Sequence, residues 1–464
     1  MSVTPLNSYH GSDTSMMFQV NKILILGNKK TKSKIILREL TFKEGDNITK
    51  YELEKKLNTN RKNIINTRLF VTVDVEFLDL GNQRVDILIQ VSERWYSYPI
   101  PIFKLADRNF SEWWTNQNRS LDRINYGIRL IHKNFRGRNE QVKITAQFGF
   151  TRKLELIYRI PYINRAQTNG LSFNFSYREN KQAAYRTFDH KQQFINSKEA
   201  TDGLKDKVIR ERFRGSISFT RRKDIHVFHS FTTGYANTWV DDTVSSSNPD
   251  YFLEGANTQE YFRLRYSFRR DFRDIRIYPL SGYLLDFNAE KIGLGIFDDV
   301  NQFEINSSFA RYYELNKGYF FTWRAGGKFS VPQRQPYTLF RAMGFGRDLI
   351  RGYELNVIEG QHMVIAQTTF KKLLFKTQQK LDKYVPIQQF QTFPLAVYIK
   401  TFFDSGYVGV DNSYPNNDRL SNEYIYGTGV GLDFVTFYDF VMRTEFSVNS
   451  EGETHFFFNV KAEF

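Results

Sequence analysis

Cysteine is absent from the 464-residue chain, and so is any apolar run long enough to cross a membrane as a helix. Without cysteine the protein can form no disulfide bond and no thiolate metal site. A transmembrane helix needs about 20 mainly apolar residues in succession, and no run of even about 18 occurs. Charged residues make up 25% of the chain and the mean hydropathy is −0.50, which also argues against a helical membrane protein.

Common catalytic motifs are missing as well. The chain lacks the Gly-x-Ser-x-Gly nucleophile elbow, the Walker phosphate loop and the His-Glu-x-x-His zinc motif. His226 and His229 are three positions apart in a predicted strand, so they face opposite sides of the sheet and cannot share a metal ion. We therefore expect no enzyme, no cofactor and no metal site, although a barrel can assemble a serine or carboxylate site across strands without a local motif.

Aromatic residues are abundant, since 44 Phe, 27 Tyr and 5 Trp make up 16% of the chain. High aromatic content together with high polarity is typical of a transmembrane β-barrel, which has one face in lipid, one in water and aromatic girdles at both interfaces. The net charge is +15, but Lys and Arg are spread along the whole chain. This distribution argues against nucleic acid as a partner and predicts positive charge that lines a lumen or faces anionic lipid head groups.

The N-terminal part of the chain predicts a small α+β domain. Residues 1–16 are polar and are expected to be disordered. A capping box at Thr49 and Glu52 opens one of the predicted helices. Apolar periodicity and glycine-containing turns predict a strand at 18–26, helices at 33–40 and 49–66, and strands at 70–78 and 85–91. We therefore place a domain at 17–94, with the order strand, helix, helix, strand, strand.

From residue 95 onward, apolar and polar residues alternate in one run after another. Val142, Ile144 and Ala146, for example, are separated by polar residues. Such alternation predicts strands with one apolar and one polar face. A soluble β-sandwich would show the same period, but its core would be rich in branched aliphatic residues, whereas Phe, Tyr and Leu dominate here. About 16 strands of about 10 residues can be placed at 95–464, which predicts a closed antiparallel transmembrane β-barrel.

The predicted connections between these strands differ in length. If the small domain is periplasmic, loops that follow odd-numbered strands are external and those that follow even-numbered strands are periplasmic. The external loops are then long, at 178–212, 241–259 and 332–359. The periplasmic turns are short, at 134–138, 164–168 and 316–318, and this asymmetry is typical of outer-membrane barrels. One connection departs from this rule, because 376–391 is long and falls on the periplasmic side.

The external loop at 332–359 contains the segment Gly344–Tyr353, which has three glycines, two arginines and several apolar side chains. This composition predicts a loop that folds back against the protein instead of extending into water. The parity of the thirteenth strand would place Asp404 in the lumen, where an unpaired carboxylate is costly. Arg351 is its predicted partner, since a guanidinium group binds a carboxylate bidentately, and Gly352 lets the loop backbone approach the wall.

Two further groups of residues belong to this predicted architecture. Gly427, Gly429 and Gly431 share one face of the fourteenth strand and are expected to leave room in the lumen for the folded loop. The last strand is expected to present apolar residues outward at an unpaired edge: Phe456, Phe458, Val460 and Phe464. The junction between the first strand, at 95–106, and the last, at 454–464, is thus the predicted weak seam of the barrel.

These features together resemble the BamA/TamA family of outer-membrane assembly proteins. The small domain resembles a POTRA domain, and Asn66–Phe70 matches the helix-to-strand junction of that module. Arg351–Tyr353, between the eleventh and twelfth strands, matches the family's loop-six Arg-Gly-aromatic motif. Phe402–Gly406, in the thirteenth strand, matches its Phe-x-Asp-x-Gly element. The resemblance covers Phe18 to Phe464.

The resemblance implies an integral protein of the bacterial outer membrane with its POTRA domain in the periplasm. Proteins of this family insert other β-barrels into the membrane or pass polypeptides across it. The expected partners are outer-membrane lipid, including lipopolysaccharide, and unfolded polypeptides that bind the POTRA edge and the barrel seam, with accessory periplasmic or lipoprotein subunits left open. One departure is Thr369, which stands where many family members have a glutamate, so the loop is expected to have one acidic anchor instead of two.

Three alternatives stay open. A two-partner-type exporter of a dedicated substrate would belong to the same family. A mitochondrial-type sorting and assembly barrel would explain a single POTRA domain, although the terminal Phe464 argues for a bacterium. A passive porin or outer-membrane enzyme would need neither the POTRA domain nor the Arg351 contact. Because the first residues show no signal-peptide pattern, we expect either a mature or engineered start or another route to the membrane.

Overall fold

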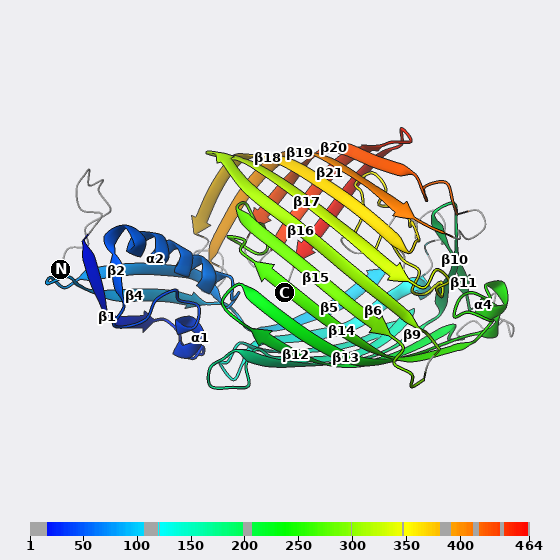
Figure 1. The fold of residues 1–464 in the computed structure, drawn as a ribbon, viewed down its shortest axis with the longest axis horizontal. Coiled ribbons are helices and arrows are strands. Elements are labelled where there is room, and N and C mark those ends of the chain that lie inside the picture. Colours follow the sequence, from blue (N-terminus) through cyan, green and yellow to red (C-terminus); the bar gives the residue numbers. More distant parts are fainter. Residues whose placement is uncertain are drawn as a thin grey trace. The chain divides into compact units, whose positions relative to one another are not determined.

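The computed structural model separates into two compact units (Figure 1), one with residues 1–95 and 136–139 and the other with 96–135 and 140–464. The residues that the structure describes are 16–105, 119, 121–197, 207–297, 299–345, 348–380, 391–411, 417–436 and 440–462. The predicted disorder of residues 1–16 therefore lies, apart from Met16, outside the described residues.

The smaller unit is a four-stranded sheet with two helices, and its strand order is β2-β1-β4-β3. Its elements are β1 (Met17–Leu26), α1 (Ser33–Leu37), β2 (Asn47–Thr49), α2 (Lys50–Ile65), β3 (Phe70–Asp79) and β4 (Arg84–Glu93). All the predicted elements are present, and the short strand β2 is an addition to them. Thr49 caps α2 as expected, since its hydroxyl accepts a hydrogen bond from the Glu52 backbone N–H at 3.3 Å. Leu53, Ile64 and Ile87 are fully buried, so helix and sheet share one apolar core.

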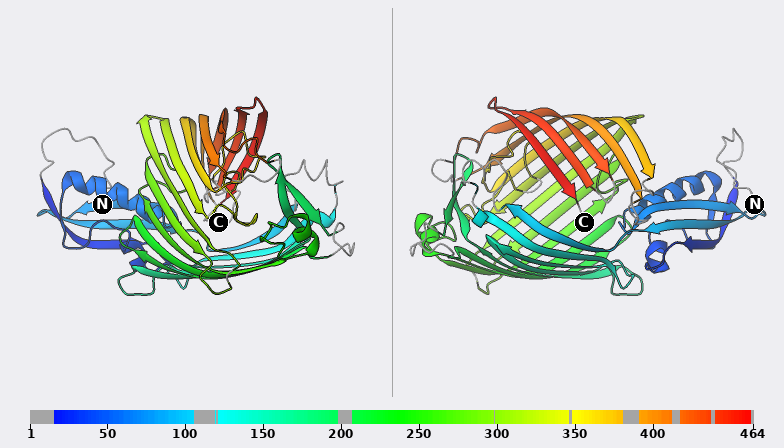
Figure 2. Two further views of the ribbon diagram at one scale, coloured as in Figure 1. Left: turned by 45° about the vertical axis from the view of Figure 1, so that its right-hand side comes forward. Right: turned by 180° about the vertical axis from the view of Figure 1, so that it is seen from behind.

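The larger unit contains one antiparallel sheet of sixteen strands, in which each strand pairs with the next one of the sheet along the chain (Figures 1 and 2). The strands are β5 (Ser97–Leu105), β6 (Ile124–Phe135), β7 (Glu140–Gly149), β8 (Thr151–Ile160), β9 (Asn169–Asn180), β12 (Arg210–Arg222), β13 (Val227–Val240), β14 (Thr258–Asp271), β15 (Gly282–Ile292), β16 (Gln302–Asn316), β17 (Tyr319–Val331), β18 (His362–Lys380), β19 (Thr392–Gly409), β20 (Tyr424–Thr436), β21 (Phe440–Asn449) and β22 (Thr454–Ala462). The predicted small α+β domain followed by a 16-stranded antiparallel sheet is confirmed.

The two faces of the barrel strands differ as the alternation predicts. On β19, Ile399 and Phe403 are 42% and 45% exposed, whereas Asp404 is fully buried. On β12, Ile217 is 49% exposed and belongs to the same outward-facing set. Apolar side chains thus cover the lipid face of the wall, and the positions between them face the interior.

In the part of the chain that the structure describes, the two ends of the sixteen-stranded sheet are not joined to each other. Among the described residues, β5 pairs only with β6, and β22 pairs only with β21. Both views in Figure 2 show the red strand β22 apart from the first barrel strands, which are blue to cyan. The structure differs here from the predicted closed cylinder, because the described parts of β5 and β22 share no ladder of hydrogen bonds at the predicted seam.

Several connections contain structure that the sequence does not predict. The external loop predicted at 178–212 is shorter, because β9 and β12 extend into it, and it carries a hairpin of β10 (Gln182–Phe188) and β11 (Lys191–Asn196). A 3-10 helix, η1 (Leu121–Arg123), precedes β6, and the helix α4 (Asp242–Ser247) follows β13. The connection predicted at 376–391 is also shorter, because β18 continues to Lys380.

The helices of the described residues are all too short or too polar to cross a bilayer.

Replacing Ile217 with lysine is expected to destabilise the barrel by about 2–4 kcal/mol, because the ammonium group would lie in lipid. Asn174 on the neighbouring strand β9 is also exposed, but it has inward parity and provides the matched control. We expect Asn174→Lys to cost less than about 1 kcal/mol, since its ammonium group would lie in the polar lumen. Urea unfolding in lipid vesicles, followed by tryptophan fluorescence, measures both costs, and equal costs would contradict the assignment of the two faces.

Candidate functional site

The external loop between β17 and β18, residues 332–361, packs against the inner faces of β18, β19 and β20, and we refer to it as loop six. Its side chains Met343, Ile350 and Tyr353 are 2%, 1% and 3% exposed. They form one buried cluster with residues of the three strands: Met363, Ile365, Val408 and Ile425. Loop six therefore lies inside the barrel, although two residues of the segment quoted above, Gly346 and Arg347, lie outside the described residues.

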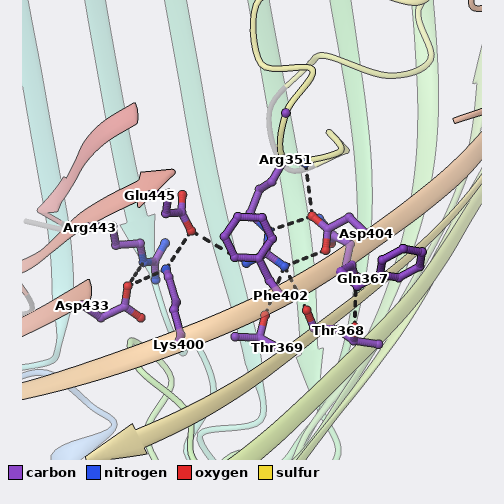
Figure 3. A network of polar contacts seen from close by, with 12 residues as sticks. Arg351, Gln367, Thr368, Thr369, Lys400, Phe402, Asp404, Asp433, Arg443 and Glu445 are labelled. Atoms are coloured by element: carbon purple, nitrogen blue, oxygen red, sulfur yellow. Dashed lines mark hydrogen bonds and ion pairs between the residues drawn. The ribbon is translucent and has the colours of Figure 1, made fainter. Parts of the chain in front are cut away.

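Arg351 of loop six binds Asp404 of β19 (Figure 3). Its Nε donates to one carboxylate oxygen at 2.7 Å and its Nη2 to the other at 2.6 Å, while its backbone N–H donates at 3.2 Å. Asp404 is fully buried, and a buried carboxylate is costly unless such donors compensate it. The structure thus brings together the two residues that the sequence predicts as partners.

Neutral groups complete the surroundings of the guanidinium group. Nη2 of Arg351 also donates to the carbonyl oxygen of Thr368 and to the hydroxyl of Thr369, both at 3.1 Å. The ring of Phe402 lies against the guanidinium carbon, with 3.9 Å between that carbon and the ring centroid. Thr369 therefore contacts the arginine through a neutral oxygen, at the position where the family resemblance leads one to expect an acid.

A second negative charge comes from β21. Glu445 Oε1 lies 3.7 Å from Nη1 of Arg351 and 2.7 Å from Nζ of Lys400, which in turn lies 2.5 Å from Asp433. We call Arg351, Asp404, Lys400, Asp433 and Glu445 the lumen network (Figure 3). The expectation of a single acidic anchor is therefore wrong, because Glu445 supplies a second, more distant one from another strand.

Sequence reasoning missed three members of the lumen network: Lys400, Asp433 and Glu445. Each has inward parity on its strand, and this signal is visible in the sequence. Their proximity depends on register, because Lys400 stands opposite Gly431 of β20 and Gly431 stands opposite Glu445 of β21. Glycine at this position leaves Lys400 and Glu445 free to meet across it.

The two residues after Arg351 attach loop six to the last strands of the barrel. Gly352 has a φ of 102°, which favours glycine, and its carbonyl oxygen accepts a hydrogen bond from the Asn449 side-chain amide at 3.1 Å. The Tyr353 hydroxyl lies 2.8 Å from the hydroxyl of Ser450, in the turn between β21 and β22. The Arg-Gly-Tyr segment thus contacts β19 through its first residue and the end of β21 through the next two.

Two of the predicted glycines lie directly against loop six. A Cβ atom at Gly406 would collide with the side chain of Met343 and would lie 3.0 Å from Ile350. A Cβ atom at Gly427 would overlap the carbonyl oxygen of Arg351. Any side chain at these two positions would therefore push the loop away from the wall.

The other two glycines of β20 make room for side chains of the wall. A Cβ atom at Gly429 would lie 2.6 Å from the ring of Phe402, and one at Gly431 would lie 3.0 Å from Lys400. Of the three glycines expected to accommodate the loop, only Gly427 contacts it among the described residues, and the other two accommodate residues that surround Arg351.

The predicted residues of the C-terminal strand divide into two groups. Phe456 and Phe458 are 68% and 57% exposed, on the same face of β22. The side chain of Val460 and the whole of Phe464 lie outside the described residues. Two aromatic rings therefore stand on the lipid face of a strand that has a neighbour on one side.

A second segment enters the barrel from the turn between β14 and β15, at the end opposite to loop six. Tyr278 of this turn is 5% exposed, and its hydroxyl donates to Asp433 at 2.7 Å. Its ring contacts Tyr398, with 5.0 Å between centroids, and Lys371, whose Nζ lies 4.2 Å from its centroid. Sequence reasoning missed this contact; the available signal is the apolar residues of Ile275–Leu280, in the connection between the two strands.

Two glutamates of loop six have a raised pKa. Burial raises the pKa of Glu359 to about 7, although Thr187 and Asn417 donate hydrogen bonds to it at 2.5 and 3.1 Å. Burial likewise raises the pKa of Glu354 to about 7, although the backbone N–H of Gly352 donates to it at 2.7 Å. Through Thr187, Glu359 connects loop six to the β10–β11 hairpin.

The described residues contain no group of three or more His, Asp or Glu side chains arranged to hold a metal ion. His226 and His229 have separate partners. Nδ1 of His226 lies 2.8 Å from the Asp271 carbonyl oxygen, and Nδ1 of His229 lies 2.9 Å from the Tyr266 hydroxyl.

Arg351→Ala and Asp404→Ala are each expected to destabilise the barrel by about 3–5 kcal/mol, because each leaves a buried charge without its partner. The double variant is expected to cost much less than the sum, so that a double-mutant cycle gives a large coupling energy. Arg152 of β8 and Glu179 of β9, which pair at 3.2 Å and are 62% and 20% exposed, provide the control cycle away from loop six. We expect a coupling below about 1 kcal/mol there. Full additivity at Arg351 and Asp404 would contradict the proposed interdependence.

Glu359→Gln is expected to raise the thermal midpoint at pH 8 and to lose this advantage near pH 4. Since the folded protein holds a proton that the unfolded chain releases at lower pH, the contribution of Glu359 to stability decreases as pH rises from about 4 to about 7. The expected gain at pH 8 is about 1–3 kcal/mol. Glu254 is exposed, and Glu254→Gln should leave the midpoint unchanged at both pH values. A pH-independent effect of Glu359→Gln would contradict this prediction.

Both units of the chain match known protein families. The Omp85 superfamily domain matches residues 134–436, and the POTRA family, described as surface antigen variable number repeat, matches residues 18–94. None of the curated protein sequences compared with the chain matches it.

Several solved structures share the fold. BamA from Haemophilus ducreyi lacking POTRA domains 1–3 is 13% identical, with a TM-score of 0.52 over 96% of this chain and 85% of that one. CdiB from Escherichia coli is 11% identical, with a TM-score of 0.54 over 96% and 76% of the two chains. CdiB from Acinetobacter baumannii is 12% identical, with a TM-score of 0.50 over 96% and 73%.

The family match covers more than half of the chain and confirms the predicted resemblance. Members of this superfamily handle polypeptides in transport and assembly and are not enzymes, as expected from the sequence. The chain therefore belongs to the Omp85 superfamily, as a β-barrel integral to the bacterial outer membrane with a POTRA domain in the periplasm.

Proposed function

We propose that the protein inserts other β-barrel proteins into the outer membrane by pairing their strands with the free edges of its own barrel. The observation that carries this proposal is the absence of a ladder between the described parts of β5 and β22. Unpaired backbone N–H and C=O groups cost several kcal/mol each in hydrocarbon. A client strand that adds to β22 or β5 forms hydrogen bonds with these groups, and its own backbone groups gain partners as well.

Loop six supports this role by bracing the wall beside the seam. Arg351 binds β19, while Gly352 and Tyr353 contact Asn449 and Ser450 at the end of β21. The loop therefore ties the last strands to one another through contacts outside their backbone ladders. A braced wall keeps the edge of β22 in one conformation, which lowers the entropic cost of adding a client strand.

The POTRA domain supplies a second edge. In the sheet order β2-β1-β4-β3, the ten-residue strand β3 is an outer strand, and among the described residues it pairs only with β4. Extended peptides add to such edges through backbone hydrogen bonds, with little demand on sequence. This edge is suited to hold an unfolded client before it reaches the barrel.

Passage of a polypeptide through the lumen is the second candidate function. It is favoured by the polar inner wall opposite the lumen network, where Arg210, Arg212 and Arg214 share the inward face of β12. Export would need loop six to leave its position, whereas strand addition at the seam would not.

Depletion of the protein, followed by proteomics of the outer membrane, separates the two functions. We expect the amounts of several unrelated β-barrel proteins in the outer membrane to decrease together. A seam that binds strands through their backbone groups does not select clients by sequence. A plasmid copy should restore them, Arg152→Ala on β8 should restore them as well, and Arg351→Ala should fail. Loss of one secreted polypeptide with unchanged barrel proteins would overturn the proposed role and favour export.

A further inference from the structure

A row of arginines lines the inner face of β12 and its surroundings, apart from the lumen network. Arg210, Arg212 and Arg214 occupy alternate positions, so they repeat at about 7 Å along the strand. Arg178 of β9 stands directly opposite Arg212. Arg341 of loop six lines a common cavity with Arg210. We call these five residues the arginine row.

The arginine row is only weakly compensated by acids of the described residues, among which Glu359 of loop six acts on Arg341. Within the part of the chain that the structure describes, none of its members forms an ion pair with a carboxylate, and the Nε atoms of the three β12 arginines are buried without a hydrogen-bond partner. Glu155 acts on Arg178 from β8, but its carboxylate already binds Lys143 and Lys153 at 2.7 and 2.6 Å. Like charges directly opposite each other on neighbouring strands are destabilising, so the row carries a cost in the absence of an anion.

A cavity of about 280 Å³ lies beside the row. Its lining includes Arg210, Arg341 and Glu359 together with the rings of Tyr251, Tyr337 and Phe345, and burial raises the pKa of Glu359 to about 7. Guanidinium donors next to aromatic rings suit a ligand that carries anionic groups and apolar groups close together. An acidic polypeptide segment is such a ligand.

We propose that the arginine row binds acidic segments of an extended polypeptide inside the barrel. In an extended chain, side chains on one face also repeat at about 7 Å, so carboxylates at every second position can meet successive guanidinium groups. A compact anion such as phosphate would reach only one or two of them. A weakly compensated row in a confined lumen also attracts anionic segments over a distance.

This inference rests on the proposed function, because a client whose strands pair at the seam still has to bring the polar segments between those strands across the membrane. The polar segments of a client that cross the membrane cannot pass through hydrocarbon without losing their hydrogen bonds. The lumen is their polar route, and the arginine row lies along it. The row thus defines a class of client segment, namely one with acidic residues at alternate positions.

The test measures binding of a fluorescein-labelled peptide, with glutamate at every second position, to the full-length protein in detergent micelles by fluorescence anisotropy. We expect saturable binding at low ionic strength and a loss of affinity of at least about tenfold in Arg212→Gln, the loss expected for one charge-assisted hydrogen bond. Arg221→Gln is the matched control, since Arg221 is exposed and has the opposite parity on the same strand. It should leave the affinity within about twofold, because a distant exposed charge is screened.

Three results would overturn the inference: wild-type affinity in Arg212→Gln, equal affinity for a peptide with lysine in place of glutamate, and displacement of the peptide by inorganic phosphate at equal concentration. Arg212→Gln is expected to keep or raise the thermal midpoint, since it removes the repulsion from Arg178. A lower midpoint together with lost binding would make the row structural and would also overturn the inference. Arg341→Gln repeats the test from loop six, in case the strand variant does not fold.

Peptide binding is measured without any assembly reaction, so the two proposals can fail separately. Binding in the wild type with unchanged barrel proteins on depletion would leave the arginine row in place and remove the assembly role. Loss of barrel proteins on depletion, without peptide binding by the wild type, would support the assembly role and overturn the inference about the arginine row.

Discussion

The neutralisation of Arg351 inside the barrel is the interaction on which the rest of the interior depends. Asp404 is fully buried, so the pair cannot rely on solvent, and its bidentate geometry fixes the loop relative to β19. Only with this charge matched can the apolar side chains of loop six pack against the wall in one buried cluster. Gly406 and Gly427 allow that packing, because any Cβ atom there would hold the loop off. The Arg351–Asp404 pair thus anchors loop six to β19, and the Arg324–Asp348 pair anchors it to β17.

Charge is distributed unequally over the inner wall. On the side of β18 to β21, acids lie close to the bases: Asp404, Asp433 and Glu445 lie against Arg351, Lys400 and Arg443, and Lys371 is a further base beside Tyr278. On the side of β9 and β12, the arginines have no such counterparts among the described residues. Loop six packs against the side of β18 to β20 and contributes Arg341 to the other side, where we propose that an anionic segment from outside binds.

The strand pattern and the Arg351–Asp404 pair could be predicted from the sequence, because both follow from local rules. Alternation alone assigns Asp404 to the inner face, and a lone inward carboxylate calls for a cation. The contact of Glu445 with Arg351 could not be predicted from the sequence, since it depends on the register of β19, β20 and β21. Tyr278 was missed because a turn can enter the lumen only if the wall offers a partner such as Asp433. Closure at the seam is likewise a property of the whole sheet and not of any one strand.

Tyr278 and Arg351 reach the lumen network from opposite ends of the barrel, and Lys400 is the residue they share. Lys400 balances Asp433, which holds Tyr278, and also Glu445, which lies beside Arg351. The segments that enter the lumen from its outer and inner mouths are thus held by one shared set of charges, in which Lys400 lies between Asp433 and Glu445.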